Sequence, residues 1–172
     1  VIETIKKRTS IRTYRNEPLE DNIKKSLEMY FKGISGPFEA SVRFMLIENN
    51  MKDESLKLGT YGVIKNPPAF IVAAVEKRGM YLEQLGYEFE KAVLYATSFG
   101  LGTCWLAGTF KKSEFQKAAG LGENEELPVV SPVGYPEDNR RFFERFMRMA
   151  AGSDNRKDSH ELFFNESFDR SF

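Results

Sequence analysis

The 172-residue sequence predicts an α+β fold, and three observations support this prediction. Helical periodicity covers residues 19–31 and 81–99, and short apolar runs rich in branched side chains cover 40–48, 69–75 and 127–136. The expected order of helix, strand, strand, helix, short helix, strand and helix lacks the strict alternation of a parallel doubly wound sheet. With 41% hydrophobic and 13% aromatic residues, the chain can bury the core of one domain.

The first helix is expected over residues 19–31, LEDNIKKSLEMYF, because its apolar side chains recur at helical spacing. Two carboxylates, Glu20 and Asp21, stand in the first turn, where the helix dipole favours negative charge. The predicted apolar face of this amphipathic helix comprises Ile23, Leu27, Tyr30 and Phe31.

Two strands are expected next in the chain. Residues 40–48, ASVRFMLIE, alternate between polar and apolar side chains and then run apolar, which indicates a strand. Residues 69–75, AFIVAAV, follow the chain-breaking Asn66-Pro67-Pro68 and carry only apolar side chains. This second strand is therefore expected to be buried on both faces.

A long helix is expected over residues 81–99. Apolar residues outside its main face, at Tyr87, Leu94 and Tyr95, predict that the helix is buried nearly all round. Gly100 and Gly102 follow it, where a left-handed helix cap is expected. The main apolar face comprises Leu82, Leu85, Phe89, Ala92, Val93 and Ala96.

Two further elements are expected before residue 137. Residues 111–119 predict a short helix with Ser113 as its N-cap. Residues 127–136, LPVVSPVGYP, predict a strand that closes in a Gly-Tyr-Pro turn. Because proline cannot donate a ladder hydrogen bond, Pro132 predicts an edge strand or a strand end.

The end of the chain differs in composition from the rest. Residues 140–152, RRFFERFMRMAAG, predict a helix, and the predicted domain covers residues 1–150. The polar tail over residues 151–172 contains phenylalanines, and each forgoes about 1.5–3 kcal/mol if it stays exposed. The tail is therefore expected to pack on the body of the chain or on a second copy through Phe163, Phe164, Phe168 and Phe172.

Charge and composition argue against several function classes. Twenty-five basic residues balance 25 acidic ones, so no overall field favours nucleic acid or an anionic membrane, and no apolar segment is long enough to span a bilayer. One cysteine, Cys104, and one histidine, His160, allow no internal disulfide and no Cys/His zinc cluster, and no metal site is expected. Cys104 is expected to be a small buried residue of a cytoplasmic protein, and a Cys-His nucleophilic pair is the alternative.

The stretch RTSIR near the N-terminus is a candidate phosphate site. On an extended segment, Arg8, Ser10 and Arg12 share one side, and on a helix the two arginines still share a face. Two guanidinium groups and a hydroxyl can match the oxygens of a phosphate dianion. The alternative is an exposed basic helix end without a ligand.

Three stretches in order, RTSIRTY, GLGTCWLAG and PVGYP followed by Arg140-Arg141, resemble landmarks of the FMN-dependent nitroreductase superfamily. The match from NPPAFIVAAV through FEKAVLYATSFGLGTCWLAGTF is most similar to a nitroreductase subfamily in which two half-copies are fused in one chain. The resemblance covers residues 3–141. It implies a nitroreductase-like fold with a mainly antiparallel central sheet flanked by helices.

The resemblance also implies cofactor-binding roles and no acid-base side chain. Arg8 and Ser10 match residues that hold the flavin phosphate, and Arg12 matches the residue at the ribityl chain and the N1/O2 edge of the ring, where a cation stabilises the reduced flavin. Without the family context, Trp105 is more often a core residue, and the alternatives for the others are that the glycines are only a helix stop and that the later arginines form solvated ion pairs. The other matched residues are Gly102, Thr103, Trp105, Leu106, Ala107, Gly108, Arg140 and Arg141.

The implied function is an FMN-binding oxidoreductase that takes electrons from NAD(P)H and passes them to a nitroaromatic, quinone or similar acceptor. One segment departs from the family, because ISGPFEASVRFMLIE replaces a Pro-Ser-x-x-Asn-x-Gln-Pro-Trp pattern. The resemblance places the flavin at a subunit interface, so we expect a homodimer or a fused second half, with this chain as the first half. The alternatives are a catalytically silent protein with an incomplete flavin site, and another flavin reaction such as dehalogenation, flavin or iron reduction, or ring cleavage.

Overall fold

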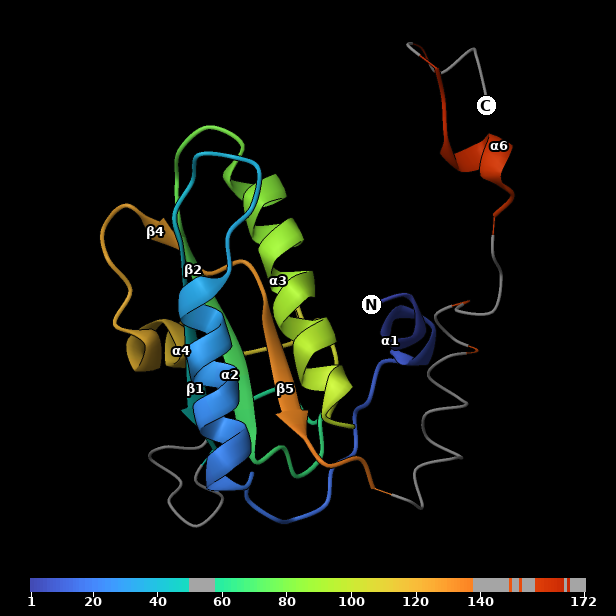
Figure 1. Ribbon diagram of the computed structural model, residues 1–172. Coiled ribbons are helices and arrows are strands. Elements are labelled where there is room, and N and C mark those ends of the chain that lie inside the picture. The colour runs from blue at the N-terminus through green and yellow to red at the C-terminus, as the bar shows by residue number, and fades with distance from the viewer. Residues whose placement is uncertain (50–57, 138–148, 150–151, 153–156, 166, 168–172) are drawn as a thin grey trace. The chain divides into compact units, whose positions relative to one another are not determined.

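The computed structural model describes residues 1–49, 58–137, 149, 152, 157–165 and 167. The chain divides into two compact units, Val1–Glu137 and Asp138–Phe172. The first unit contains the sheet and the helices α1 to α4 (Figure 1). Within the described part of the second unit, α6 covers Ser159–Leu162.

The sheet is antiparallel throughout its described pairs, which confirms the α+β prediction. The strand order is β1-β2-β5-β3, and β4 also pairs with β2. In the longest pair, Val42 lies opposite Val75 and Glu48 lies opposite Ala69. The bounds are Val42–Glu48 for β1, Ala69–Glu76 for β2, Gly102–Thr103 for β3, Glu125–Glu126 for β4 and Val130–Gly134 for β5.

Strand β2 is buried on both faces, as its apolar run predicts. Ile71 and its alternate neighbours face the core that α2 and α3 cover, whereas Phe70 and Val72 belong to the core on the opposite face. On that second face, Phe70 meets Phe115 of α4 edge to face, with ring centroids 4.9 Å apart. A fully apolar strand is stable here because helices cover both faces of the sheet.

Helices α2 (Asp21–Gly33) and α3 (Tyr81–Ser98) cover one face of the sheet, as Figure 1 shows. The amphipathic prediction for α2 is confirmed, because Leu27 and Phe31 are buried and Ile23 and Tyr30 pack against the core.

The prediction that α3 is buried all round is wrong. Leu82 and Tyr87 are about half exposed, while two polar residues, Gln84 and Glu88, are buried. The buried face includes these polar residues because they bind the loop between α2 and β1. The apolar residues that do face the core are Leu85, Phe89, Ala92, Val93 and Ala96.

The ends of two helices differ from prediction in part. Gly100 has φ +76°, the expected left-handed cap after α3, but Gly102 lies in β3. Helix α4 (Lys112–Ala119) has Lys111 at its N-cap, so the prediction of Ser113 as the cap is wrong. The helix begins earlier because Glu114 binds Lys111 and the backbone N–H of Gly59, which fixes the first turn to a neighbouring loop.

Pro132 lies in the middle of the sheet, so the prediction of an edge strand is wrong. Strand β5 pairs with β2 on one side and with β3 on the other. Val130 exchanges backbone hydrogen bonds of 2.9 and 3.1 Å with Leu106. Because backbone N–H groups two residues apart in a strand point to the same side, the Pro132 nitrogen also faces the segment that contains Leu106. The ladder is interrupted there because the N–H of Cys104 donates to Ser131 Oγ at 3.0 Å, so the missing proline donor costs no ladder bond.

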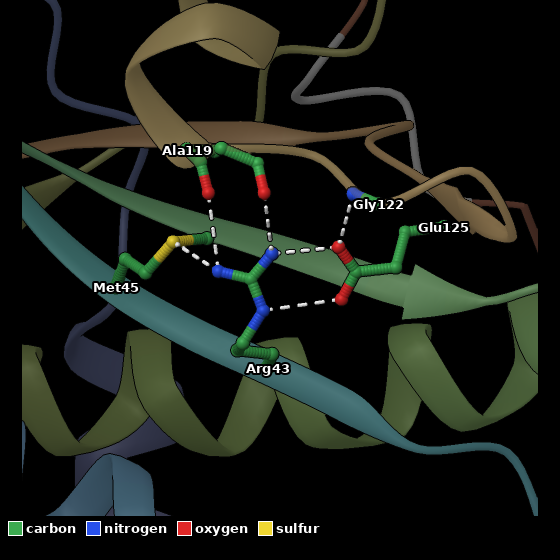
Figure 2. A network of polar contacts seen from close by, with 6 residues as sticks. Arg43, Met45, Ala119, Gly122 and Glu125 are labelled. Atoms are coloured by element: carbon green, nitrogen blue, oxygen red, sulfur yellow. Dashed lines mark hydrogen bonds and ion pairs between the residues drawn. The ribbon is translucent and has the colours of Figure 1, made fainter.

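Arg43 of β1 ties α4 and β4 to the sheet (Figure 2). Its Nε and Nη2 donate to both carboxylate oxygens of Glu125, at 3.1 and 2.6 Å. The same guanidinium donates to the backbone oxygens of Ala119 and Gly120, at 3.1 and 3.3 Å, where α4 ends. The hydrogen bond from Arg43 lowers the pKa of Glu125 below its ordinary value, which indicates that the folded state favours the ionised carboxylate.

The predictions for the tail fall mostly outside the described residues. Phe163 is 60% exposed and Phe164 is partly buried, while Phe168, Phe172 and most of residues 140–152 are not described. Packing of the tail on the body or on a second copy stays a prediction. Among the described residues, no helix is long and apolar enough to cross a membrane.

Candidate functional site

The stretch RTSIR lies extended beside β3, which decides between the two geometries open from sequence. Helix α1 covers Ile2–Lys7, and Arg8 follows it with φ −61° and ψ 123°. Ser10 forms a parallel bridge with Thr103, and the N–H of Ile11 donates to the Thr103 oxygen at 2.8 Å. Arg8, Ser10 and Arg12 are each partly buried beside the buried Ile11, and a shared side for the three side chains stays a prediction of the extended pattern.

Gly102 permits this close pairing. A Cβ built at Gly102 would lie 2.7 Å from the Ile11 Cβ, so any larger residue would push the two segments apart. The stretch GLGTCWLAG therefore contacts the stretch RTSIRTY at a point where only glycine fits.

Thr103 carries a buried hydroxyl that has no partner among the described residues. The residue is 1% exposed, and its Oγ1 makes no hydrogen bond within the described part of the chain. A buried hydroxyl left unpaired costs about 1–3 kcal/mol, so such an atom needs an explanation. Thr103 pairs directly with Ser10, which places this hydroxyl next to the candidate phosphate site.

A carboxylate of α3 joins the first landmark to Trp105. Trp105 Nε1 donates to Glu90 Oε2 at 2.8 Å, and Arg8 Nε lies 3.5 Å from Glu90 Oε1. Trp105 is 39% exposed and packs edge to face on Phe89, with centroids 4.7 Å apart. Trp105 therefore lies at the rim of the core, beside the candidate site.

The backbone around Arg12 is held from a second side. Lys65 N–H donates to the Arg12 oxygen at 2.8 Å, and Tyr14 N–H donates to the Lys65 oxygen at 3.0 Å. The fully buried Tyr14 donates its hydroxyl to the Ile11 oxygen at 2.6 Å. The segment that carries the two arginines is thus fixed before any ligand binds.

A family model described as "Putative TM nitroreductase" matches residues 1–171. The chain belongs to this nitroreductase family. The resemblance noted in the sequence is therefore confirmed, while the fusion of two half-copies stays a prediction.

Two archaeal relatives carry the description "Putative NADH dehydrogenase/NAD(P)H nitroreductase". The protein from Archaeoglobus fulgidus is 27% identical over 83% of this chain and 89% of its own length. The protein from Methanothermobacter thermautotrophicus is 27% identical over 81% of this chain and 78% of its own length.

Two solved structures show the same fold. A nitroreductase family protein from Clostridium difficile aligns over 98% of this chain and 99% of its own, with TM-score 0.68 and 20% identity. A nitroreductase with bound FMN from Bacteroides fragilis aligns over 80% of this chain and 89% of its own, with TM-score 0.62 and 19% identity.

The segment after Trp105 lies partly in the core and partly at the surface. Leu106 is buried, and its backbone N–H and oxygen both bond Val130. Ala107 and Gly108 are exposed, and a Cβ at Gly108 would meet no atom within 4 Å. The contacts around position 108 therefore do not require glycine there. Arg140 and Arg141 lie outside the described residues.

The loop that departs from the family pattern is bound by polar residues of α3. The N–H of Phe38 donates to Gln84 Oε1 at 2.7 Å, and Lys91 Nζ donates to the Ser35 oxygen at 3.0 Å. Glu88 accepts hydrogen bonds from Gln84 and from the Gly36 backbone, and its burial raises its pKa above the ordinary 4.5. Helix α3 thus holds the loop by direct contacts, and the loop lacks the family's asparagine and glutamine.

Sequence reasoning missed Glu90 and the buried pair Gln84 and Glu88. All three lie on a helix whose apolar periodicity dominated the prediction. The one available signal was the interruption of that periodicity by polar residues at positions 84 and 88, which are four apart and share a face. Glu90 has no such signal, because its partners Arg8 and Trp105 are distant in the sequence.

Proposed function

We propose that this nitroreductase binds FMN, with Arg8 and Ser10 at the phosphate, and that it passes electrons from NAD(P)H to a small acceptor such as a nitroaromatic or a quinone. The pairing of Ser10 with Thr103 is the observation that carries the proposal. It brings two family landmarks together around one side of an extended, basic segment. FMN is named for three solved structures of similar fold, and NAD(P)H is named for the two archaeal relatives.

The residues present fit a flavin phosphate. Within the described residues, Arg8 uses Nε for Glu90, and the Thr103 hydroxyl is buried without a partner. Arg8 can offer planar donors and Ser10 a hydroxyl, which together match several oxygens of a dianion. Charge-assisted hydrogen bonds of this kind are about twice as strong as neutral ones.

The other residues of the site would orient the ligand and exclude water, and none of them needs to exchange a proton. Bound FMN would supply two-electron transfer between NAD(P)H and the acceptor. Arg12 would add a fixed positive charge near Arg8, which favours negative charge on a ligand there. Trp105, packed on Phe89, would shield one edge of the site from water, and Ala107 and Gly108 are exposed residues that follow it.

Flavin titration of the full chain tests the proposal. Wild-type protein is expected to retain FMN after dialysis and to show the visible absorbance of bound flavin. Arg8→Ala should weaken FMN binding by about 100-fold, because each charge-assisted hydrogen bond contributes about 1.5–3 kcal/mol. The matched control is Lys6→Ala, which removes one positive charge of the exposed Lys6–Glu3 pair.

Two results would contradict the proposal. A wild-type protein that stays colourless after FMN addition and dialysis would reject the cofactor. If Arg8→Ala lowers the melting temperature of the apo-protein as strongly as it weakens FMN binding, Arg8 has a purely structural role.

The 35–38 loop favours a second candidate, a flavin-binding protein with an incomplete catalytic site. The departing segment lacks the asparagine and glutamine that the family pattern places there, and α3 binds the backbone of Ser35 and Phe38 instead. A second copy or a fused second half would complete the site under the main proposal. Flavin-loaded protein that does not oxidise NAD(P)H with any of a panel of acceptors would favour the silent alternative.

The compartment belongs to the proposal as well. Cys104, the one cysteine of the sequence, is 2% exposed and allows no disulfide within the chain, as is usual for proteins of a reducing compartment such as the cytoplasm. Localisation of the tagged protein in its native cell tests this point directly.

A further inference from the structure

The Glu90 carboxylate links two residues that the proposed flavin site uses. Its Oε2 accepts a hydrogen bond from Trp105 Nε1 at 2.8 Å, and its Oε1 lies 3.5 Å from Arg8 Nε. The three residues come from three parts of the fold: the segment after α1, helix α3, and the segment after β3. A single side chain therefore connects the arginine at the candidate phosphate site to the stretch 105–108.

The ion pair engages only one side of the Arg8 guanidinium. A guanidinium has one N–H on Nε and four on the two terminal nitrogens. Glu90 takes the Nε side, and no other carboxylate pairs with Arg8 in the described ranges 1–49 and 58–137. The Nη1–Nη2 edge, whose parallel donors match two phosphate oxygens, is left for a ligand.

Glu90 itself has little freedom to follow Arg8 into other rotamers. It sits on α3 directly after the fully buried Phe89. The indole that donates to it packs against Phe89 at 71° between ring planes. Core packing thus fixes the indole, and the indole fixes the carboxylate.

Burial indicates what this ion pair contributes. The Arg8 and Glu90 side chains are 29% and 39% exposed, so solvent screens their attraction and the pair adds little to folding stability. Holding a long side chain in one rotamer, however, reduces the entropy that is lost when the ligand binds. The effect of Glu90 is therefore expected in ligand affinity rather than in stability.

We infer that Glu90 is a positioning residue, which orients the Arg8 guanidinium for a phosphate monoester and couples this orientation to Trp105. The inference rests on the proposed function, because the monoester is that of FMN. An opposite role is physically distinct: a carboxylate that merely occupied the place of the phosphate would compete with the ligand, and its removal would tighten binding.

Affinities of the full chain for FMN and for riboflavin, which lacks the phosphate, test this inference. The variants are Glu90→Ala, Glu90→Gln, Arg8→Ala and the double variant, with Glu83→Ala on the exposed side of α3 as the control. Binding is followed by flavin fluorescence, because Trp105 is the only tryptophan and its own emission would change with Glu90. Apo-protein melting temperatures show that each variant folds.

Glu90→Ala is expected to weaken FMN binding by about tenfold, the lower end of the effect of removing an outer partner of a metal-binding side chain, and to leave riboflavin binding unchanged. Glu90→Gln should fall between wild type and Glu90→Ala, because its amide oxygen still accepts from Trp105. In the Arg8→Ala background, Glu90→Ala should cause no further loss, since Glu90 acts through Arg8.

Other outcomes overturn the inference. Unchanged or tighter FMN binding in Glu90→Ala would reject positioning, and so would an equal loss of both flavins or an additive loss in the double variant. If wild type prefers FMN over riboflavin and every Glu90 variant has the same affinities as wild type, the positioning role is rejected and the proposed function stands. If wild type binds neither flavin, the proposed function fails together with this inference.

Discussion

Gly102 lies so close to Ile11 that a Cβ at position 102 would stand 2.7 Å from the Ile11 Cβ. This contact joins β3 to the basic segment, with Ser10 paired to Thr103 beside it. Substitution of one glycine therefore probes both the packing and the proposed site.

Gly102→Ala is expected to lower the free energy of unfolding by about 1–3 kcal/mol, because the added methyl group forces the two segments apart. FMN binding should weaken as well. Chemical denaturation checks the stability, with Gly86→Ala as the control. A Cβ at Gly86, in α3, meets no atom within 4 Å, so that variant should gain about 0.5–1 kcal/mol. Equal stability of the two variants would contradict the close contact.

Thr103→Val is expected to leave the apo-protein as stable as wild type or to raise its free energy of unfolding by about 1 kcal/mol. The reason is that the change removes a buried hydroxyl that has no partner within the described residues. FMN affinity should fall, because the hydroxyl then cannot bond the ligand. Thermal unfolding without and with FMN measures both effects. A destabilised apo-protein would show that Thr103 Oγ1 has a protein partner.

Glu88→Gln is expected to flatten the dependence of stability on pH. Burial raises the pKa of Glu88 above 4.5, so the folded state binds its proton more tightly than the unfolded state does. The contribution of Glu88 to stability is therefore largest below about pH 4.5 and falls as pH rises through the folded pKa. Melting temperatures of wild type and Glu88→Gln across this range should diverge in favour of the variant as pH rises.

The exposed Glu83 of the same helix supplies the control, since Glu83→Gln should keep the wild-type pH dependence. A constant difference between wild type and Glu88→Gln at every pH would show that Glu88 has the same pKa in both states.

Arg43→Met is expected to lower the free energy of unfolding by about 1–2 kcal/mol, because Arg43 joins Glu125 and the end of α4 to β1 (Figure 2). Arg43 lowers the pKa of Glu125, so this contribution is present above the unfolded pKa and is lost as pH falls through the folded pKa. Denaturation at neutral and at acidic pH should show a smaller effect of the substitution in acid. An effect of the same size at both pH values would contradict the role of the ionised carboxylate.

Elements with strong local patterns were predictable from the sequence. Strand β2 and helix α2 carry their burial in the spacing of their own side chains, and both match prediction. The position of Pro132 in the sheet was predicted wrongly because it depends on the neighbouring segment of the same chain. There the N–H of Cys104 donates to the Ser131 hydroxyl instead of continuing the backbone ladder. No local pattern contains that information.

The candidate site was predictable only as separate stretches. RTSIR and GLGT each suggested a role, but the pairing of Ser10 with Thr103 is a contact between segments far apart in the chain. Glu90 was not predicted for the same reason, because a carboxylate on an amphipathic helix is ordinary until its partners Arg8 and Trp105 are known.

The preference of the wild-type chain for FMN over riboflavin tests most directly whether the Arg8–Arg12 segment binds a flavin phosphate. Dissociation constants for both flavins are measured under identical salt, because exposed charges are screened. FMN should bind about 100-fold more tightly than riboflavin, which corresponds to about 2.7 kcal/mol from the phosphate. Equal affinity for the two flavins, or binding of neither, would contradict a phosphate site at Arg8 and Ser10.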